Sequence, residues 1–531
     1  MERSYFKYIF VIVVIVLIAY TGYKMIKDNN KSETEANLDQ TSTVSTIQKD
    51  LRLAIAEMDT INPILSKNRN VQEITKIIFE PLVTLNENYK KEYKLATEIA
   101  KQDGTTYLIK LRQGVVWHDG TPFTANDVKF TVDNIKNGGI SSIYSENLKY
   151  VTGLEVIDNY TLKMSLSQEV PFFEYYLTFP ILSQKYYEGT DLQNADKNVA
   201  PVGTGLFKIA SVNANVITLT KNESYWNLDQ KPMAEEVIIT NYQTIGEVYN
   251  SFKSGDIDLV TVTANNVENY IGTIGYNKIE YKARNYDFLS FNTATDIFSE
   301  KEVRKAISLC IDKENLVATC LGNGYTVSNF SLDMGHWLYT KDLNTQVNTE
   351  QAKVLLETAG WSYKNNSWQK KVDGQTKKLE FTITVNNDNS GRVKAAENIA
   401  EQLKNFGITV DVKEVNSDKY YNSLNNKDYE CIIAGLEVGF TPNLETFFGK
   451  GNIANYNNEE LQNILNTVKN TNDESEMYNN YSRIYDIYLD EAPYIGLYRN
   501  TETIICNQGL VGNITPNSFN IYHNIEKWYR Q

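Results

Sequence analysis

The chain has 531 residues, 42% of them apolar and 22% charged, and this composition is typical of a globular protein rather than a disordered one. A chain of this length exceeds what one hydrophobic core can serve, so two or more lobes are expected. The formal net charge of −14 argues against nucleic acid as a partner, because phosphate binding requires a basic face.

The amino terminus contains an apolar run with basic residues on both sides. Residues 8–20 are almost all apolar, which is typical of a segment that inserts into a membrane or forms the core of a signal peptide. Residues 1–27 are therefore predicted to be an N-terminal membrane anchor, with a cleaved signal as the alternative. Residues 28–50 lack aromatic side chains and are rich in Ser, Thr and Asn, which favours a flexible tether.

The first part of the globular sequence carries both strand and helix signals. Residues 51–55 and 105–111 have apolar side chains at alternating positions, which predicts two strands. Thr124 lies three residues before an acid and is expected to open an amphipathic helix. Residues 154–166 predict a β-hairpin that turns at residues 158–159, because apolar and polar residues alternate after this Asp-Asn pair.

The second half is richer in helix signals. Ser299 and Glu302 have the spacing of a capping box, and the apolar stripe that follows at helical spacing places Cys310 in the core. Asn348 is expected to open another helix, which Gly360 closes. The four cysteines are scattered and form no C-x-x-C pair, so we expect them to be buried free thiols.

The clearest unit lies between residues 379 and 415. Residues 379–385 alternate as a strand, residues 393–403 follow at helical spacing, and Gly407 ends that helix before a second alternating stretch. Strand, helix and strand in this length form a βαβ unit with parallel strands and a right-handed crossover. An α/β fold is therefore predicted.

The sequence lacks the motifs of the common enzyme classes. It contains no G-x-x-x-x-G-K-[ST], no G-x-S-x-G and no H-E-x-x-H. His118 is followed by an aspartate and a glycine, but Asp-Gly after a strand is a turn signal, and no nucleophile is near it in the sequence. We therefore predict a binding protein without catalytic residues, metal ligands or a cofactor.

A set of short segments resembles a known family in content and in order. The segments run from about residue 50 to past residue 360, and the longest of them is Leu111–Val128. The others include Asp59-Thr-Ile-Asn-Pro63, Ile78-Phe-Glu-Pro-Leu82, Pro201-Val-Gly-Thr-Gly205, Asn222-Glu-Ser-Tyr-Trp226 and Val303-Arg-Lys-Ala-Ile-Ser308. On these segments the chain resembles the family 5 extracellular solute-binding proteins, which include oligopeptide-, dipeptide- and nickel-chelate-binding receptors.

The resemblance implies an α/β fold with two lobes. This fold is a periplasmic-binding-protein-like clamshell of the cluster C type, in which the first lobe carries an extra inserted domain. The first lobe would comprise residues 50–78, 200–285 and 499–531, the inserted domain residues 79–199, and the second lobe residues 286–498. The lobes would close around a ligand by a hinge motion.

The resemblance also implies a function. The chain would be the extracytoplasmic substrate-binding receptor of an ABC importer, a monomer held at the membrane by its N-terminal segment. It would deliver a small ligand to permease subunits, with an oligopeptide as the leading expectation. Two alternatives stay open: the same fold binding a metal chelate, haem or an oligosaccharide, and a surface sensor without a permease.

One position departs from the family's peptide-binding pattern. Peptide-binding members hold the peptide's ammonium with an aspartate in a Trp-x-x-Asp-like stretch of the second lobe. The corresponding segment here, residues 435–442, has no aspartate; Val438 occupies the position and Glu437 precedes it. A buried ammonium without a carboxylate is costly. Either Glu437 replaces the aspartate, or the free amine is not what this receptor binds.

Further ligand-binding residues are expected from the same resemblance. Gly439 and Phe440 continue the segment that contains Glu437. Phe440, Trp337 and Tyr286 are candidates for the walls of the cleft, and packing within or between the lobes is the alternative for each of them.

Overall fold

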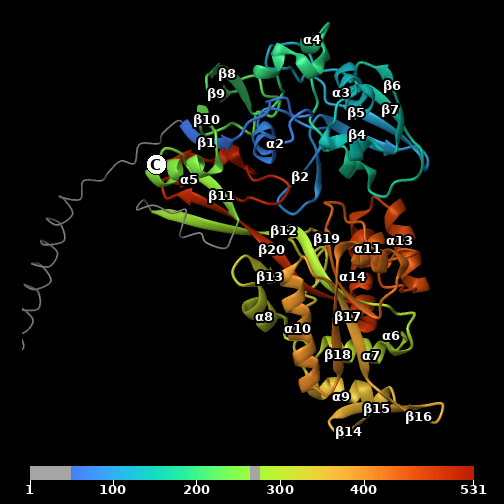
Figure 1. The fold of residues 1–531 in the computed structure, drawn as a ribbon. Helices are drawn as coiled ribbons and strands as arrows, with labels where there is room; N and C mark the ends of the chain where they lie inside the picture. Colours follow the sequence, from blue (N-terminus) through green and yellow to red (C-terminus); the bar gives the residue numbers. More distant parts are fainter. Residues whose placement is uncertain (1–49, 264–274) are drawn as a thin grey trace, which may run out of the picture. The chain divides into compact units, whose positions relative to one another are not determined.

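The computed structural model describes residues 50–263 and 275–531, drawn in colour in Figure 1. The predicted anchor, residues 1–27, and nearly all of the predicted tether lie outside the described residues. Within the described ranges, no helix combines the length and the apolar character that crossing a bilayer requires. The fold is α/β, and its framework is two four-stranded sheets and one seven-stranded sheet.

The first sheet contains the amino-terminal strand of the described chain. Its strands, in spatial order, are β1 (Asp50–Ala56), β10 (Glu236–Tyr242), β9 (Val216–Lys221) and β8 (Phe207–Asn213). Strand β1 runs parallel to β10, whereas the other pairs are antiparallel. Helix α2 (Arg69–Thr75) follows β1 and is capped by the side chain of Asn68, which accepts bonds from two backbone N–H groups. The strand predicted at residues 51–55 is confirmed.

The second four-stranded sheet is fully antiparallel. Its strands are β4 (Ala96–Lys101), β5 (Thr106–Leu111), β7 (Thr161–Leu166) and β6 (Val151–Asp158). The predicted hairpin is the β6–β7 pair, but it turns at residues 159–160 rather than 158–159, because Asp158 is still paired with Thr161. Thr124 forms a capping box with Asp127 at the start of α3 (Ala125–Asn137). Three short elements lie nearby in the sequence: β2 (Val83–Leu85), β3 (Lys91–Tyr93) and α4 (Gln184–Tyr187).

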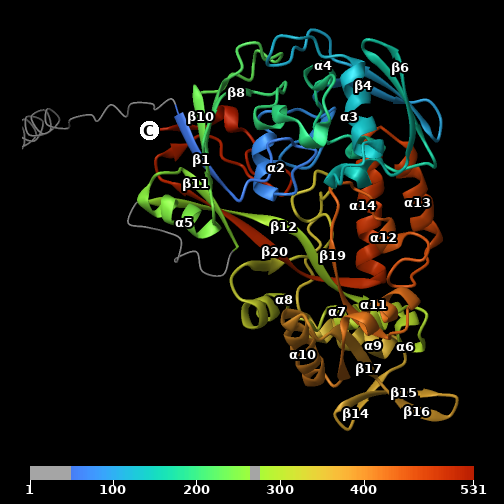
Figure 2. The ribbon, with the colours of Figure 1, turned by 45° about the horizontal axis from the view of Figure 1, so that its top comes forward.

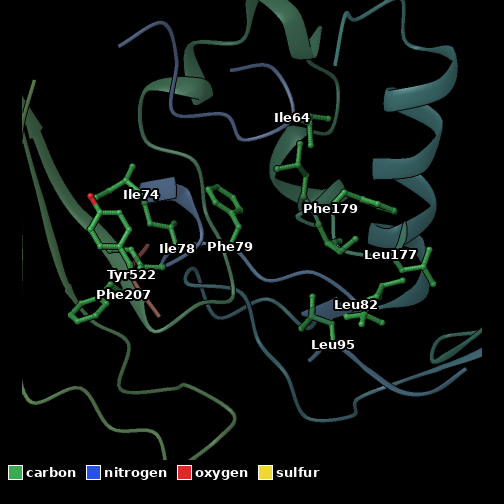
Figure 3. Close-up of a cluster of buried hydrophobic side chains, with 14 of the residues drawn as sticks. Ile64, Ile74, Ile78, Phe79, Leu82, Leu95, Leu177, Phe179, Phe207 and Tyr522 are labelled. Atoms are coloured by element: carbon green, nitrogen blue, oxygen red, sulfur yellow. The ribbon is translucent and has the colours of Figure 1, made fainter. Parts of the chain in front are cut away.

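One hydrophobic core connects these two sheets. The chain between them passes through residues 74–82, and Figure 3 shows the apolar side chains of this stretch packed with others from distant parts of the sequence. Ile78, Phe79 and Leu82 are buried there with Phe207 from the first sheet and Tyr522 from the carboxyl-terminal segment. The stretch is therefore held firmly enough to serve as a wall for a binding site.

The seven-stranded sheet is built on two long strands. Strands β12 (Tyr276–Phe291) and β20 (Tyr494–Asn507) pair antiparallel along most of their length. The other strands are β11 (Leu259–Thr263), β13 (Tyr325–Val327), β17 (Glu380–Asn386), β18 (Thr409–Val415) and β19 (Cys431–Glu437). Both long strands run across the predicted lobe boundaries at residues 285 and 498, so the same ladder serves both predicted lobes; the boundaries themselves stay a prediction.

The predicted βαβ unit is confirmed in its two parallel strands and its connecting helix. Strands β17 and β18 are parallel, and α10 (Ser390–Asn405) connects them. Gly407 follows the helix with a φ of +90°, a left-handed conformation that glycine adopts without strain. The remaining helices are α5 (Ile245–Ser254), α6 (Asp296–Ser299), α7 (Lys301–Ser308), α8 (Lys313–Leu316), α9 (Thr349–Thr358), α11 (Ser417–Asn426), α12 (Glu445–Phe448), α13 (Glu459–Asn470) and α14 (Glu474–Glu491).

Helix α7 begins differently from the sequence prediction. Ser299 is the last residue of α6, its hydroxyl donates to the carbonyl of Asp296, and Glu300 is the N-cap residue of α7. The capping-box prediction is therefore wrong. The physical reason is that Phe298 is buried in the core, where it holds the preceding turn in a short helix of its own. The apolar stripe was placed correctly, because Val303, Ala306 and Ile307 are all buried.

The cysteines are free thiols, as expected. Cys310, Cys431 and Cys506 are buried, whereas Cys320 is only half-buried, so the expectation of burial fails for that residue. Burial raises the pKa of the Cys310 thiol to about 12, which makes it an unreactive core residue. Asn348 caps α9 through its side chain, and Gly360 follows the helix with a φ of +85°, both as predicted.

A buried arginine holds the two long strands and a neighbouring loop together. Arg499 on β20 has no exposed surface, and its guanidinium donates to the carbonyls of Ala283 at 3.0 Å and Ser331 at 2.8 Å. It also lies 3.3 Å from the carboxylate of Asp333 and 5.0 Å from the centre of the Tyr286 ring. The loop at residues 328–333 is thereby fixed against β12.

His118 supports the backbone of residues 203–205. Its Nδ1 accepts a hydrogen bond from the N–H of Gly203, so Nε2 carries the proton and donates to the carbonyl of Gly205 at 3.1 Å. Gly205 itself approaches Ile78 so closely that a Cβ atom would lie 2.7 Å from the carbonyl oxygen of Ile78. Burial lowers the pKa of His118 to about 4, so the neutral imidazole is the folded form at neutral pH.

Replacing Arg499 with Met is expected to lower the free energy of unfolding by about 3–5 kcal/mol, because the carboxylate of Asp333 would lose a buried partner. Urea denaturation measures the effect. The matched control is Arg483→Met, which removes an arginine whose side chain is 55% exposed in its pair with Glu460, and this change should cost less than about 1 kcal/mol. Equal effects of the two substitutions would contradict the role assigned to Arg499.

The free energy of unfolding should fall as the pH is lowered from about 6.5 to about 4, in part because of His118. The unfolded chain binds a proton at this residue in that window, whereas the folded chain does not, so acid favours the unfolded state. Denaturation at a series of pH values measures this fall in the free energy of unfolding. The fall should be smaller by about 2 kcal/mol in His118→Asn than in the unaltered protein. Parallel curves for the two proteins would show that His118 titrates normally.

Candidate ligand-binding cavity

A cavity of about 760 Å³ opens beside the two long strands and the residue 74–82 stretch. Its volume is within the range of small-molecule binding sites. Segments far apart in the sequence contribute to its wall: residues 69–94, 143–147, 175–180, 205–230, 284–285, 437–441, 502 and 518–526. A site assembled from so many distant segments depends on the complete fold rather than on one motif.

Aromatic rings cover a large part of the cavity wall. Phe440 and Phe519 meet edge to face with ring centres 5.2 Å apart, and the buried ring of Tyr89 stacks on Phe440 at 5.8 Å. Tyr144 and Tyr175 also line the cavity. Aromatic side chains, and tyrosines with their polar tip, provide the mixture of apolar contact and hydrogen bonding that a wet binding site requires.

Two arginine–glutamate pairs are among the charged groups of the wall. Arg284 lies 3.0 Å from Glu437, and Arg69 lies 2.8 Å from Glu502. All four residues line the cavity. Burial lowers the pKa of Arg284, whereas Glu502 outweighs the effect of burial and raises the pKa of Arg69. The wall thus presents both signs of charge, and other acidic and basic side chains, among them Glu73, Lys76, Glu92, Lys94 and Glu526, also line it.

A change of register in the long strands places Arg284. The β12–β20 pairing shifts between Lys282 and Tyr286, which interrupts the regular alternation of side chains. On the other edge of β12, Asn285 is paired with Glu437 of β19, so Arg284 lies next to this pair. The Arg284 guanidinium donates to the carbonyl of Val438 at 2.8 Å and stacks over the Phe440 ring at 4.4 Å.

Glu80 is a cavity residue whose carboxylate is already engaged. It is buried and accepts hydrogen bonds from Thr204 at 3.0 Å, Tyr225 at 2.8 Å and Trp226 at 3.0 Å. Burial raises the pKa of Glu80, although these three donors favour the charged form. Glu80 therefore fastens the wall stretch to residues 204–226 and has little capacity left for a ligand.

Three of the expected site residues line the cavity together: Glu437, Gly439 and Phe440. The Glu437 side chain is 63% exposed, so its carboxylate is accessible to a ligand. Val438, which stands where peptide-binding members have aspartate, is buried among apolar residues, and its N–H donates to the carbonyl of Arg284. Glu437 thus supplies the only acidic side chain of the segment from 435 to 442.

The other two expected residues lie behind the wall. Tyr286 has no exposed surface and packs in the core beneath Arg499, so its position matches the packing alternative. Trp337 is half-buried and does not line the cavity, but its indole N–H donates to the hydroxyl of Tyr175, which does. Its backbone N–H also donates to the carbonyl of Asn88 at 2.8 Å. Trp337 therefore supports a wall residue.

Sequence reasoning missed Arg284, the Arg69–Glu502 pair and the carboxyl-terminal stretch 518–526. No local pattern marks these residues, because each reaches the cavity through pairing or packing between distant parts of the chain. Among the described residues, no group of three or more His, Cys, Asp or Glu side chains is arranged to hold a metal ion.

Comparison with known proteins identifies the family. The profile of the bacterial extracellular solute-binding proteins, family 5, matches residues 92–455. The chain is 24% identical over 495 residues to the oligopeptide-binding protein AppA of Bacillus subtilis, with 90% of each chain covered.

Solved structures share the fold over nearly the whole length. The murein tripeptide-binding protein MppA, in its unliganded open form, matches with a TM-score of 0.77 at 21% identity, covering 92% of this chain and 99% of MppA. A nickel ABC transporter protein from Bacillus halodurans matches with a TM-score of 0.73 at 20% identity, covering 90% of this chain and 99% of that protein. The predicted α/β fold of a two-lobed periplasmic binding protein is confirmed by these likenesses. The chain belongs to the family 5 bacterial extracellular solute-binding proteins.

Proposed function

We propose that the chain is the extracytoplasmic receptor of an ABC importer and that it binds oligopeptides in the cavity described above. The observation that carries the proposal is the cavity wall, where aromatic rings surround two arginine–glutamate pairs. A peptide has a charged group at each end and an amphipathic body, so a wall of this kind offers a partner to each part. The 24% identity to AppA and to the oligopeptide-binding protein OppA of Bacillus subtilis supports this ligand class.

Glu437 is proposed to bind the ammonium group of the peptide in place of the missing aspartate. Its carboxylate is accessible, and a carboxylate can accept more than one charge-assisted hydrogen bond. Glu437 can therefore keep its contact with Arg284 while it accepts a bond from the ligand. In the same way, Arg69 and Arg284 are proposed to bind the peptide's carboxylates, with Phe440 and Phe519 against its apolar parts.

The predicted lobes are proposed to close through contacts of the kind that the structure contains near Trp337. In the proposed division, residues 79–199 form the inserted domain, and residues 286–498 form the second lobe. The bond from Trp337 to Asn88 and the ion pair between Lys90 and Glu474, 2.7 Å apart, both join these two ranges. Residues 50–78, 200–285 and 499–531 complete the first lobe in this proposal.

The membrane attachment belongs to the same proposal. The apolar amino-terminal segment, residues 1–27, is proposed to anchor a monomeric receptor outside the cytoplasm, beside its permease subunits, with residues 28–50 as the tether. No bond is made or broken in this function. A non-peptide solute is the second candidate, because Val438 lacks the carboxylate of peptide-binding members and a nickel transporter protein shares the fold.

Native mass spectrometry of the purified chain should show co-purified peptides, and calorimetry with a peptide library should then give their affinities. A preparation that retains and binds only metal chelates, haem or sugars would contradict the peptide assignment.

Substitution of Phe440 by Ala should cause a loss of peptide binding, because it removes a ring from the cavity wall.

Replacing Glu437 with Gln should weaken the binding of free peptides about 10- to 100-fold, because one charge-assisted hydrogen bond is lost. N-acetylated peptides should bind the variant and the unaltered protein equally. Glu155→Gln is the matched control, because Glu155 is an exposed partner of Lys163 outside the cavity. If free and acetylated peptides bind alike to the unaltered protein, Glu437 does not hold the amine.

A further inference from the structure

A small antiparallel sheet precedes the βαβ unit. Its strands are β14 (Ser362–Lys364), β15 (Ser367–Val372) and β16 (Gln375–Lys378). Two-residue turns connect them, Asn365-Asn366 and Asp373-Gly374, and all four turn residues have φ between +50° and +79°. Turns with positive φ at both central residues match the twist of the flanking strands and fix their register. In Figures 1 and 2 the three strands lie beyond helix α9.

The register assigns the lysines of this sheet to two faces. Residues directly opposite each other in an antiparallel pair share a face. Trp368, Lys370 and Lys377 therefore belong to one face, because Lys370 is opposite Lys377. This is the inner face: Trp368 is buried, Lys370 lies 2.6 Å from Glu300, and Lys377 lies 3.4 Å from Asp296.

The other face of the sheet carries three further lysines. Lys364, Lys371 and Lys378 are exposed, and none of them forms an ion pair with the described residues. The remaining positions of this face are small or neutral polar residues: Ser362, Ser367, Gln369 and Thr376. We call these seven residues the lysine face. Its uniform positive charge contrasts with the formal net charge of −14 of the whole chain.

We propose that the lysine face binds the surface of a membrane that contains anionic phospholipids. Charges are screened beyond about 8 Å in physiological salt, so the lysine face acts by its own charge rather than by that of the chain. Each lysine near an anionic bilayer raises the partition onto it about fivefold, and three together raise it about 100-fold. The turn-defined register holds all three on one side of a sheet, where they can contact lipid phosphates simultaneously.

The composition of the lysine face favours a lipid surface over a protein partner. Protein interfaces are enriched in aromatic residues and arginine and depleted in lysine, and their strongest contacts are aromatic or arginine side chains in pockets. The lysine face contains no aromatic, aliphatic or arginine side chain. Lysine instead binds phosphate groups as a flexible point charge, which suits the loosely ordered headgroups of a bilayer.

Lysine acetylation of the full chain tests the proposal, because contact with phosphate protects an amine from the reagent. The chain is mixed with phosphatidylcholine vesicles, with or without phosphatidylglycerol, and the acetylation rate of each lysine is followed by mass spectrometry. Lys364, Lys371 and Lys378 should react about fivefold more slowly on the phosphatidylglycerol vesicles, and the protection should disappear at about 0.5 M salt. Basic residues flank the amino-terminal segment, so its own binding responds to phosphatidylglycerol, and protection is therefore scored against other lysines of the same chain.

Three exposed lysines elsewhere provide the internal reference: Lys67, Lys185 and Lys231. Their rates should be the same on both vesicle types, and the triple variant of these residues to Gln should keep the protection of the lysine face. The variant K364Q/K371Q/K378Q should lose the additional affinity for phosphatidylglycerol vesicles that the lysine face provides. Equal acetylation of all six lysines on both vesicle types would overturn the proposal. Protection by a soluble phosphate polymer but not by phosphatidylglycerol would also overturn it, because the occupant would not be a lipid surface.

Discussion

The buried guanidinium of Arg499 is the contact on which the binding site depends. It joins β20 to β12 through the carbonyls of residues 283 and 284, and it joins both strands to the loop that contains Asp333. A buried charge is stable only with a full set of partners, so this arrangement tolerates little displacement. Arg284 belongs to the strand segment that Arg499 holds and reaches the cavity from it. The position of the Arg284 charge in the cavity thus depends on Arg499, which is buried and does not line the cavity.

The surroundings of Arg284 explain why the acidic residue is at position 437 rather than at position 438, where peptide-binding members have aspartate. A carboxylate at position 438 would have been buried beside Arg284, whereas Val438 fills that place with an apolar side chain. The acidic group is moved by one residue to Glu437, which is exposed to the cavity and is balanced by Arg284 at 3.0 Å. The result is a charge pair at the wall rather than a single buried anion.

Local patterns in the sequence predicted the elements that depend on local physics. The βαβ unit, the β6–β7 hairpin and the cap at Thr124 all follow from periodicity and turn chemistry within a few residues. Ser299 was misassigned because the burial of Phe298 decides where α7 begins. Of the site, only the segment around Glu437 could be found from sequence, through its resemblance to a family.

The rest of the site could not be read from the sequence, because it is made by long-range pairing. Arg284 reaches the cavity through a register shift between strands about 210 residues apart in the chain, a feature without a local signal.

Amide hydrogen exchange of the full chain, with and without bound peptide, tests the account most directly. Protection on binding is expected in residues 69–80, 437–441 and 518–526, which surround the cavity. Protection confined to other segments would show that the ligand binds elsewhere.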